Sequence, residues 1–262
     1  SSTSSTWLAH AKSYVDMITF RLGLGTESFV IEVASNDGYL LKNFVTSRVP
    51  CLGVEPTDST AAAAEALGVP VAREFFGQSF ADKLVKSGKQ ADLIIGNNVY
   101  AHVPDINDFT AGMKTALKLG GTITLEFPHL MNLNAMGLNQ FDTVYHEHYS
   151  YLSLQSVRSI FAKARLRVFD VEQIPTHGGS LRIFGCHDAD SRVDTAAVAR
   201  VLAEELSNGL QDLPTYQRFQ RAADIVKNRL LAFLVEASLA GKTVAAYGAA
   251  AKGNTLMNYA GV

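Results

Sequence analysis

The chain has 262 residues, of which 47% are hydrophobic and 18% are charged. This apolar content can offset the entropy lost on ordering the chain, which excludes an intrinsically disordered protein. The net charge is −2 and no basic block occurs, so nucleic acid is not expected as a partner. The apolar runs fall far short of the ~20 residues that span a bilayer, and the N-terminal residues lack a signal-peptide pattern. Because the two cysteines, Cys51 and Cys186, lie in apolar runs as buried thiols would, we expect a cytoplasmic protein with no membrane contact.

Residues 7–22 carry apolar side chains at helical spacing, which predicts a helix within an N-terminal lead-in over residues 1–28. From there to residue 127, short apolar runs alternate with helical patterns. The predicted strands cover residues 29–33, 51–55, 69–72, 91–97 and 122–127, and the predicted helices cover residues 37–47, 59–67, 78–86 and 106–117. This alternation predicts right-handed crossovers and a doubly wound, mostly parallel α/β sheet with helices on both faces.

The pattern changes after Pro128. Residues 128–152 have no periodicity, a helix is predicted over 154–164, and the runs 166–174 and 180–186 are close enough to pair as antiparallel strands. We therefore expect one domain over residues 29–188. Residues 189–262 are expected to form a helical linker over 194–239, with a break near Pro214, and then, from residue 242, a strand, a glycine turn and a helix start. These last elements would begin a second α/β lobe.

The turn after the first predicted strand reads VIEVASNDGYL. A dinucleotide fingerprint requires G-x-G-x-x-G, but its places hold Ala34, Asn36 and Tyr39, which argues against NAD. The segment from Gly248 to Gly253 has the Walker A spacing but lacks its lysine. The pattern E-x-A-x-N-x-G instead resembles the acidic and glycine-containing loop of class I S-adenosylmethionine (SAM) methyltransferases, whose sheet is Rossmann-like.

Other residues expected to bind the cofactor lie at the ends of the neighbouring strands. Glu55 ends the second strand, where a carboxylate can accept two hydrogen bonds from a ribose diol, although a solvated acid is the alternative. Asn97 and Asn98 end the fourth strand and could equally be turn residues. Phe75 and Phe76 follow the third strand, where they could contact an adenine ring or pack in the core. The predicted cofactor site consists of Glu32, Ala34, Asn36, Asp37, Gly38, Glu55, Phe76, Asn97 and Asn98.

Five segments together resemble the sugar C-methyltransferases of deoxysugar biosynthesis: EVASNDG, NNVYAHVPD, EFPHL, YHEHYSYLSL and THGGSLR. The resemblance covers essentially the whole chain. It implies a SAM-dependent enzyme with a seven-stranded sheet that methylates a 4-keto nucleotide sugar, usually at C3. Members of that family usually carry an N-terminal zinc module and a complete C-terminal lobe. This sequence lacks the cysteines of the module and does not complete the lobe, so we expect no zinc and a core that is not fully active alone.

The segment from Tyr145 to His148 holds the expected catalytic groups. Methylation at carbon requires a base that removes the C3 proton and donors that stabilise the resulting enolate. We expect His148 to be the base, because its ordinary pKa is near neutrality, and Tyr145 and Glu147 to place the sugar; the family motif assigns catalysis to the same three positions. An extended backbone would separate these side chains, so a turn is expected within the motif.

Further residues are expected around the acceptor. His102 follows the fourth strand and could bond the keto oxygen, and the expected acceptor pocket also includes His177, Gly178 and Arg182. Arg182 could alternatively pair with an acid, and Lys252 could meet a phosphate. His146 and His148 could chelate a metal, but that arrangement suits an antiparallel barrel, so no metal is expected.

The sequence thus predicts a SAM-dependent C-methyltransferase that acts through an enolate on a dTDP- or GDP-linked 4-keto-deoxysugar, as a monomer or weak homodimer. Three alternatives remain open. The chain could methylate oxygen or nitrogen of a small metabolite, it could bind a cofactor or nucleotide sugar without catalysis, or it could be a redox enzyme.

Overall fold

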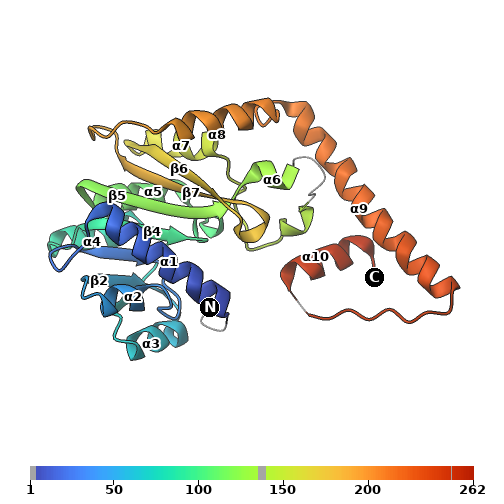
Figure 1. The fold of residues 1–262 in the computed structure, drawn as a ribbon, viewed down its shortest axis with the longest axis horizontal. Helices are drawn as coiled ribbons and strands as arrows, with labels where there is room; N and C mark the ends of the chain where they lie inside the picture. The colour runs from blue at the N-terminus through green and yellow to red at the C-terminus, as the bar shows by residue number, and fades with distance from the viewer. Residues whose placement is uncertain (1–3, 135–139, 249) are drawn as a thin grey trace.

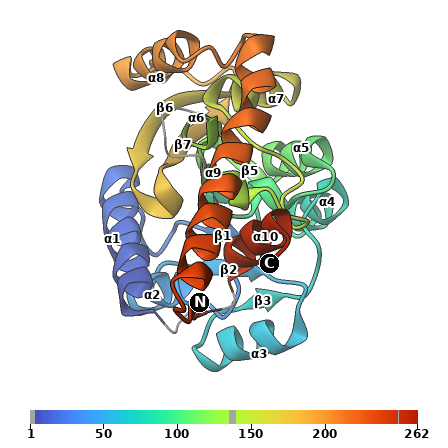
Figure 2. The same cartoon turned by 90° about the vertical axis from the view of Figure 1, so that its right-hand side faces the viewer.

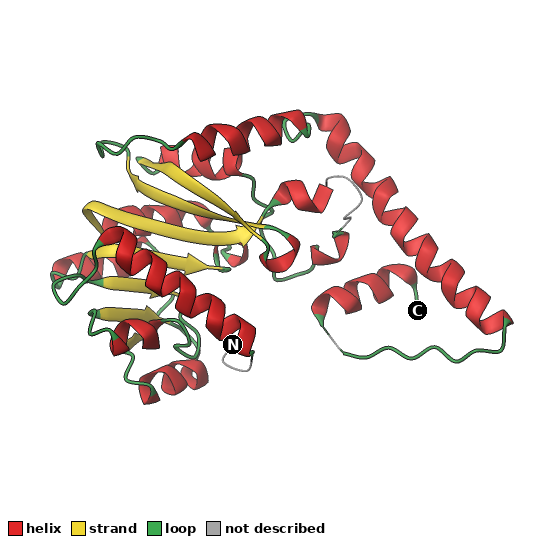
Figure 3. Cartoon of the chain, viewed as in Figure 1, coloured by secondary structure: helices red, strands yellow, loops and turns green. Residues whose placement is uncertain are grey.

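A seven-stranded sheet forms the centre of the computed structural model, which describes residues 4–134, 140–248 and 250–262 (Figures 1 and 3). The strand order is β3-β2-β1-β4-β5-β7-β6. The strands are β1 (Val30–Val33), β2 (Cys51–Val54), β3 (Val71–Ala72), β4 (Ala91–Asn97), β5 (Leu117–Pro128), β6 (Leu166–Ile174) and β7 (Ser180–His187).

The first five strands are parallel and β7 is antiparallel to both of its neighbours. The predicted parallel sheet with a terminal antiparallel pair is therefore confirmed. Because all five parallel strands end at the same edge, the segments that follow β1, β2 and β4 lie together there. Asn97 on β4 pairs with Glu126 on β5 at this edge.

Helices cover both faces of the sheet (Figure 2). On one face, α1 (Ser5–Leu22) and α2 (Leu41–Thr46) pack on Val30, Leu93 and Ile95. On the other face lie α4 (Gln78–Lys86), α5 (Ile106–Ala116) and α7 (Leu154–Lys163). The helix α3 (Asp58–Ala66) connects β2 to β3. The strands are apolar on both faces because each face is buried under helices, as expected for a parallel sheet.

Short helical segments connect the sheet to the site. They are η1 (Tyr100–His102) after β4, α6 (Leu130–Asn134) after β5, η2 (Phe141–Thr143), and η3 (Thr176–Gly178) between β6 and β7. The sequence did not predict α6, which lies within the segment without periodicity.

The C-terminal part leaves the sheet as α8 (Ala196–Ser207) and the long helix α9 (Leu213–Leu239), and ends with α10 (Ala251–Ala260) (Figure 1). Pro214 lies in the first turn of α9, so the predicted break is confirmed. The strand predicted from residue 242 is wrong, because residues 242–248 are irregular and exposed. A strand needs a neighbour for its backbone groups, and the described residues provide none there. None of the described helices has the length and apolarity needed to cross a bilayer.

Candidate active site

The turn from β1 to α2 has an unusual backbone. Ala34, Asn36 and Gly38 have φ values of 56°, 52° and 75°, in the left-handed region. A Cβ added at Gly38 would lie 2.9 Å from the Cβ of Ala64, so this position requires glycine for both its conformation and its packing. The backbone N–H of Ala34 donates to the carbonyl of Val54 at 2.8 Å, which fixes the turn against β2.

Glu55 is held beside this turn. It is 7% exposed, and its carboxylate accepts hydrogen bonds from the backbone N–H groups of Asn36 at 3.1 Å and Thr57 at 2.9 Å. The same residue lines a cavity of about 270 Å³ together with Ala34, Phe76 and His102. The structure therefore brings the predicted acid and the predicted turn to one cavity at the carboxyl edge of the sheet.

Several buried polar atoms near this edge have no hydrogen-bond partner within the described residues. They are Glu32 Oε2, Ser35 Oγ, Asn97 Oδ1 and Asn98 Nδ2. Burial raises the pKa of Glu32 well above its ordinary value, and the carboxylates of Asp37 and Glu55 raise it further. Buried polar atoms are normally hydrogen-bonded, so this arrangement fits a polar ligand that supplies the missing partners.

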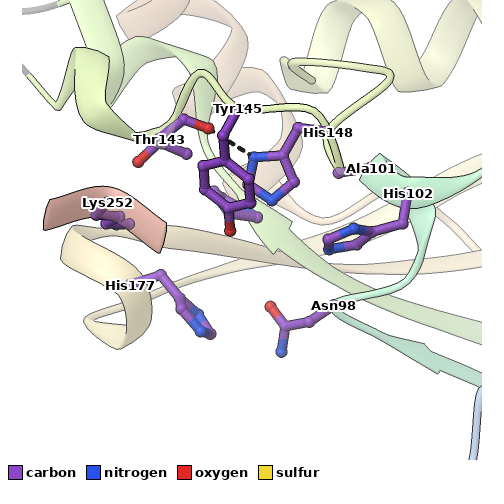
Figure 4. A pocket seen from close by; sticks show the side chains of 9 residues that line it. Asn98, Ala101, His102, Thr143, Tyr145, His148, His177 and Lys252 are labelled. Atoms are coloured by element: carbon purple, nitrogen blue, oxygen red, sulfur yellow. Dashed lines mark hydrogen bonds between the residues drawn. The ribbon is translucent and has the colours of Figure 1, made fainter. Parts of the chain in front are cut away.

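A second pocket adjoins the first, and His102 lines both. Figure 4 shows the second pocket with the Tyr145 and His148 rings together, His102 and Asn98 on one side and His177 and Lys252 on the other. Its lining residues are Asn98, Ala101, His102, Pro128, Thr143, Tyr145, His148, His177 and Lys252.

Two backbone carbonyls set the tautomers of the pocket histidines. His148 Nδ1 lies 2.9 Å from the carbonyl oxygen of Thr143, and His102 Nδ1 lies 2.9 Å from that of Glu147. A carbonyl can only accept, so we assign the proton of each neutral ring to Nδ1, which leaves Nε2 with a free lone pair. The two rings meet at a centroid distance of 4.7 Å.

His148 is kept neutral by its surroundings. Burial lowers the pKa of His148 and the charge of Lys252 lowers it further, against the opposing effects of the hydrogen bond to Thr143 and the carboxylate of Glu147. The Tyr145 ring lies 4.4 Å from the His148 ring, between centroids. The backbone N–H of His148 donates to the carbonyl of Tyr145 at 3.0 Å, and this is the turn expected within the motif. The arrangement places a neutral imidazole base and a phenol in one pocket.

Glu147 differs from its predicted role. Its side chain is 59% exposed and faces His146 at 3.9 Å, from Oε1 to Nε2. Only its backbone carbonyl reaches the site, through His102. The turn that brings Tyr145 and His148 together directs the intervening side chains towards solvent.

Arg182 also differs from its predicted place in the acceptor pocket. It lies on β7, is 7% exposed, and donates to the buried carboxylate of Glu126 at 2.6 and 2.7 Å and to Glu172 at 2.9 Å. It does not line the pocket. The alternative of a pairing with an acid therefore describes this residue, because a buried guanidinium needs buried acceptors.

His177 does line the pocket, from η3, where its φ is 54°. Gly178 follows it with a φ of 80°, and a Cβ there would lie 2.0 Å from Gln140 Nε2, so glycine lets the loop pack closely. Thr143 and Lys252 were not assigned to the acceptor pocket from the sequence. Thr143 acts through its carbonyl, for which no side-chain pattern exists, and Lys252 reaches the pocket only because α10 folds back towards η2.

The described residues contain no cluster of three or more His, Cys, Asp or Glu residues that could hold a metal. His129 is buried and lies 2.8 Å from Glu205, from Nε2 to Oε1. The carboxylate of Glu205 also accepts from the backbone N–H of Gln155, in the first turn of α7, at 3.0 Å. This pair joins α8 to the end of β5 and to α7.

The strand order and the acidic turn at the carboxyl edge define a class I methyltransferase fold. The chain belongs to the methyltransferase-domain family, whose model matches residues 8–171. Residues 175–262 match a second model, described as the C-methyltransferase C-terminal domain.

Among curated proteins, the chain is similar to the C-methyltransferase NovU of Streptomyces niveus, with 33% identity over 97% of this chain. The chain spans 60% of the length of that relative. Among solved structures, it resembles a magnesium protoporphyrin IX methyltransferase of Synechocystis with bound S-adenosylhomocysteine (SAH), with 12% identity, a TM-score of 0.54, and coverage of 69% of this chain and 83% of that one. A glycopeptide N-methyltransferase in complex with SAM gives 12% identity, a TM-score of 0.53, and coverage of 68% and 94%. At this identity these structures support the fold.

Proposed function

We propose that the chain acts as a SAM-dependent C-methyltransferase that methylates the carbon next to the keto group, at C3, of a dTDP- or GDP-linked 4-keto-deoxysugar. The observation that carries the proposal is the position of His148, which lines a pocket beside the predicted cofactor cavity and is hydrogen-bonded through Nδ1 to the carbonyl of Thr143. The similarity to a C-methyltransferase and the match of residues 175–262 support methylation at carbon.

The buried polar atoms at the sheet edge fit SAM. Glu55 would accept hydrogen bonds from the ribose hydroxyls, and Phe76 would contact the adenine, because both line the same cavity. Glu32 and Asn97 would bind the amino acid end, whose ammonium group would donate hydrogen bonds to their unpartnered oxygens. When bound, SAM would supply an electrophilic methyl group.

The residues of the second pocket account for activation of the sugar. His148 Nε2 would take the C3 proton, and the electron pair of the C–H bond would form the enolate with the adjacent carbonyl. His102 was expected to bond the keto oxygen, but its proton lies on Nδ1 toward the carbonyl of Glu147, so its neutral ring has no donor for that oxygen. The Tyr145 hydroxyl would orient the sugar ring. A base positioned in this way contributes ~10²–10⁴ in rate.

The direct test is transfer of a labelled methyl group from SAM to a dTDP-linked 4-keto-6-deoxysugar, together with exchange of the C3 hydrogen with D₂O. Label on carbon and exchange without SAM are expected. Label on oxygen or nitrogen, without exchange, would instead indicate the O- or N-methyltransferase alternative. Binding of SAH without exchange or transfer would indicate a non-catalytic module.

Replacing Glu55 with glutamine is expected to weaken SAH binding by about 10- to 100-fold, because a hydrogen bond to a charged acceptor contributes roughly 1.5–3 kcal/mol. Isothermal titration calorimetry would measure the change. Glu27→Gln, at an exposed position, is the matched control and should bind as the unchanged protein does. Equal affinity in Glu55→Gln would remove this carboxylate from the ribose site.

The exchange rate is also expected to depend on pH through His148. Its pKa lies below the ordinary value of about 6.5, and the base must be neutral to accept a proton. The rate should therefore be level above about pH 6.5 and should fall only at lower pH, as the ring becomes protonated. An exchange rate that increases with acidity would contradict the assignment.

A further inference from the structure

The helix α10 is docked beside the acceptor pocket by Tyr259. The Tyr259 ring contacts Phe141 in η2 at a centroid distance of 5.3 Å. Its hydroxyl is hydrogen-bonded to Asp224 and accepts from Gln220 Nε2 at 2.6 Å, both on α9. Residues seven apart on a helix lie on the same side, so the contacts that hold Tyr259 also direct Lys252 to the pocket near Thr143, the last residue of η2.

Lys252 introduces a positive charge that nothing in the described chain neutralises. It is half-buried and forms no ion pair with a described carboxylate. The described pocket lining contains no Asp or Glu, because the side chain of Glu147 faces solvent. The other titratable groups of the lining are His102, His148, His177 and Tyr145. This pocket is therefore suited to a group that becomes negatively charged.

We propose that Lys252 stabilises the enolate oxygen formed at C4 of the sugar, and is thus a further catalytic residue of the reaction. This assignment rests on the proposed function. The C3–H bond breaks, its proton goes to His148 Nε2, and its electron pair forms the C3–C4 double bond. The carbonyl π pair moves onto the C4 oxygen, which accepts a hydrogen bond from the Lys252 ammonium. Lys252 keeps its proton throughout, so the step needs no other reactant.

The location of Lys252 in the same pocket as His148 favours the enolate oxygen, and not the nucleotide diphosphate, as the partner of its ammonium group. C3 and C4 are bonded neighbours, so a group that reaches the C4 oxygen must share the pocket with His148. The diphosphate is attached at C1 and is separated from C3 by C2. Lys252 also lowers the pKa of His148, which agrees with a cation close to the base.

The test is the rate of C3-hydrogen exchange in D₂O, followed by NMR without SAM, for a dTDP-linked 4-keto-6-deoxysugar. In Lys252→Met, the limiting exchange rate should fall by about 10²-fold, as on removal of an oxyanion-stabilising donor, while the sugar concentration at half-maximal rate changes little. Lys252→Arg keeps the charge and should recover most of the rate. Lys242→Met removes an exposed lysine between α9 and α10 and should not alter the exchange rate.

The results separate this inference from the function on which it rests. No exchange by the unchanged protein would overturn the proposed function and the role of Lys252 with it. Exchange by the unchanged protein and equally by Lys252→Met would overturn only the role of Lys252. A raised half-saturating concentration with an unchanged limiting rate would also overturn it, because that result indicates a diphosphate contact. Unaltered SAH binding by Lys252→Met verifies that the variant is folded.

Discussion

Replacing His148 with asparagine is expected to reduce C3-hydrogen exchange and methyl transfer by about 10²- to 10⁴-fold. The asparagine amide can still donate to the carbonyl of Thr143, as His148 Nδ1 does. It has no basic lone pair at the place of Nε2, so the proton acceptor is lost while the local hydrogen bond remains. The exchange rate in D₂O and transfer of label from SAM measure the two steps separately.

His146→Asn is the matched control for this variant. His146 belongs to the same motif, but its side chain is 87% exposed and lies outside the pocket. The His146→Asn variant should exchange the C3 hydrogen of the sugar at the rate of the unchanged protein. SAH binding should be equal in both variants, because neither residue lines the predicted cofactor cavity. Undiminished exchange by His148→Asn would show that another group removes the proton.

The sheet was predictable because its signal is local. Buried parallel strands are continuous apolar runs, and the runs predicted at residues 166–174 and 180–186 pair as antiparallel strands. The start of β5 was placed too late, at residue 122, because Gly120 and Gly121 resemble the end of a helix. In the structure the pairing continues past them to Leu117, opposite Ala91, through an irregular register. Only the neighbouring strand defines that extension.

The grouping of residues at the carboxyl edge of the sheet could be predicted more directly than the lining of the second pocket. Glu55 and Ala34 lie at the ends of parallel strands, which the sheet topology brings together. Side-chain directions within the turn of residues 145–148 depend on its dihedral angles, which the sequence does not specify. Glu147 therefore points outwards, although it lies between two pocket residues. Lys252 depends on the long-range docking of Tyr259, for which no local pattern exists.

Arg182 was misplaced because its partner was not visible in the sequence. Glu126 lies 56 positions earlier, on β5, and the antiparallel register sets the two residues side by side. Burial alone would raise the pKa of Glu126, but the hydrogen bond from His10 and the charge of Arg182 hold it below its ordinary value. The carboxylate is therefore ionised at neutral pH, although it is completely buried.

Replacing Arg182 with methionine is expected to lower the free energy of unfolding by about 3–5 kcal/mol, because it leaves the charge of Glu126 buried without its guanidinium partner. Denaturant unfolding followed by circular dichroism would measure the loss. Arg165→Met is the matched control, since Arg165 is 79% exposed, and an exposed ion pair contributes at most about 1 kcal/mol.

A double variant separates the buried charge from the lost packing. Glu126→Gln combined with Arg182→Met removes both charges, so it should recover part of the stability lost in Arg182→Met alone. Should Arg182→Met unfold like the unchanged protein but need more sugar for half-maximal exchange, then Arg182 contributes to the acceptor pocket and not to the stability of the sheet. The two roles predict different results, because an Arg182 side chain that turned towards a substrate would give up its hydrogen bonds to Glu126 and leave that carboxylate buried and unpaired.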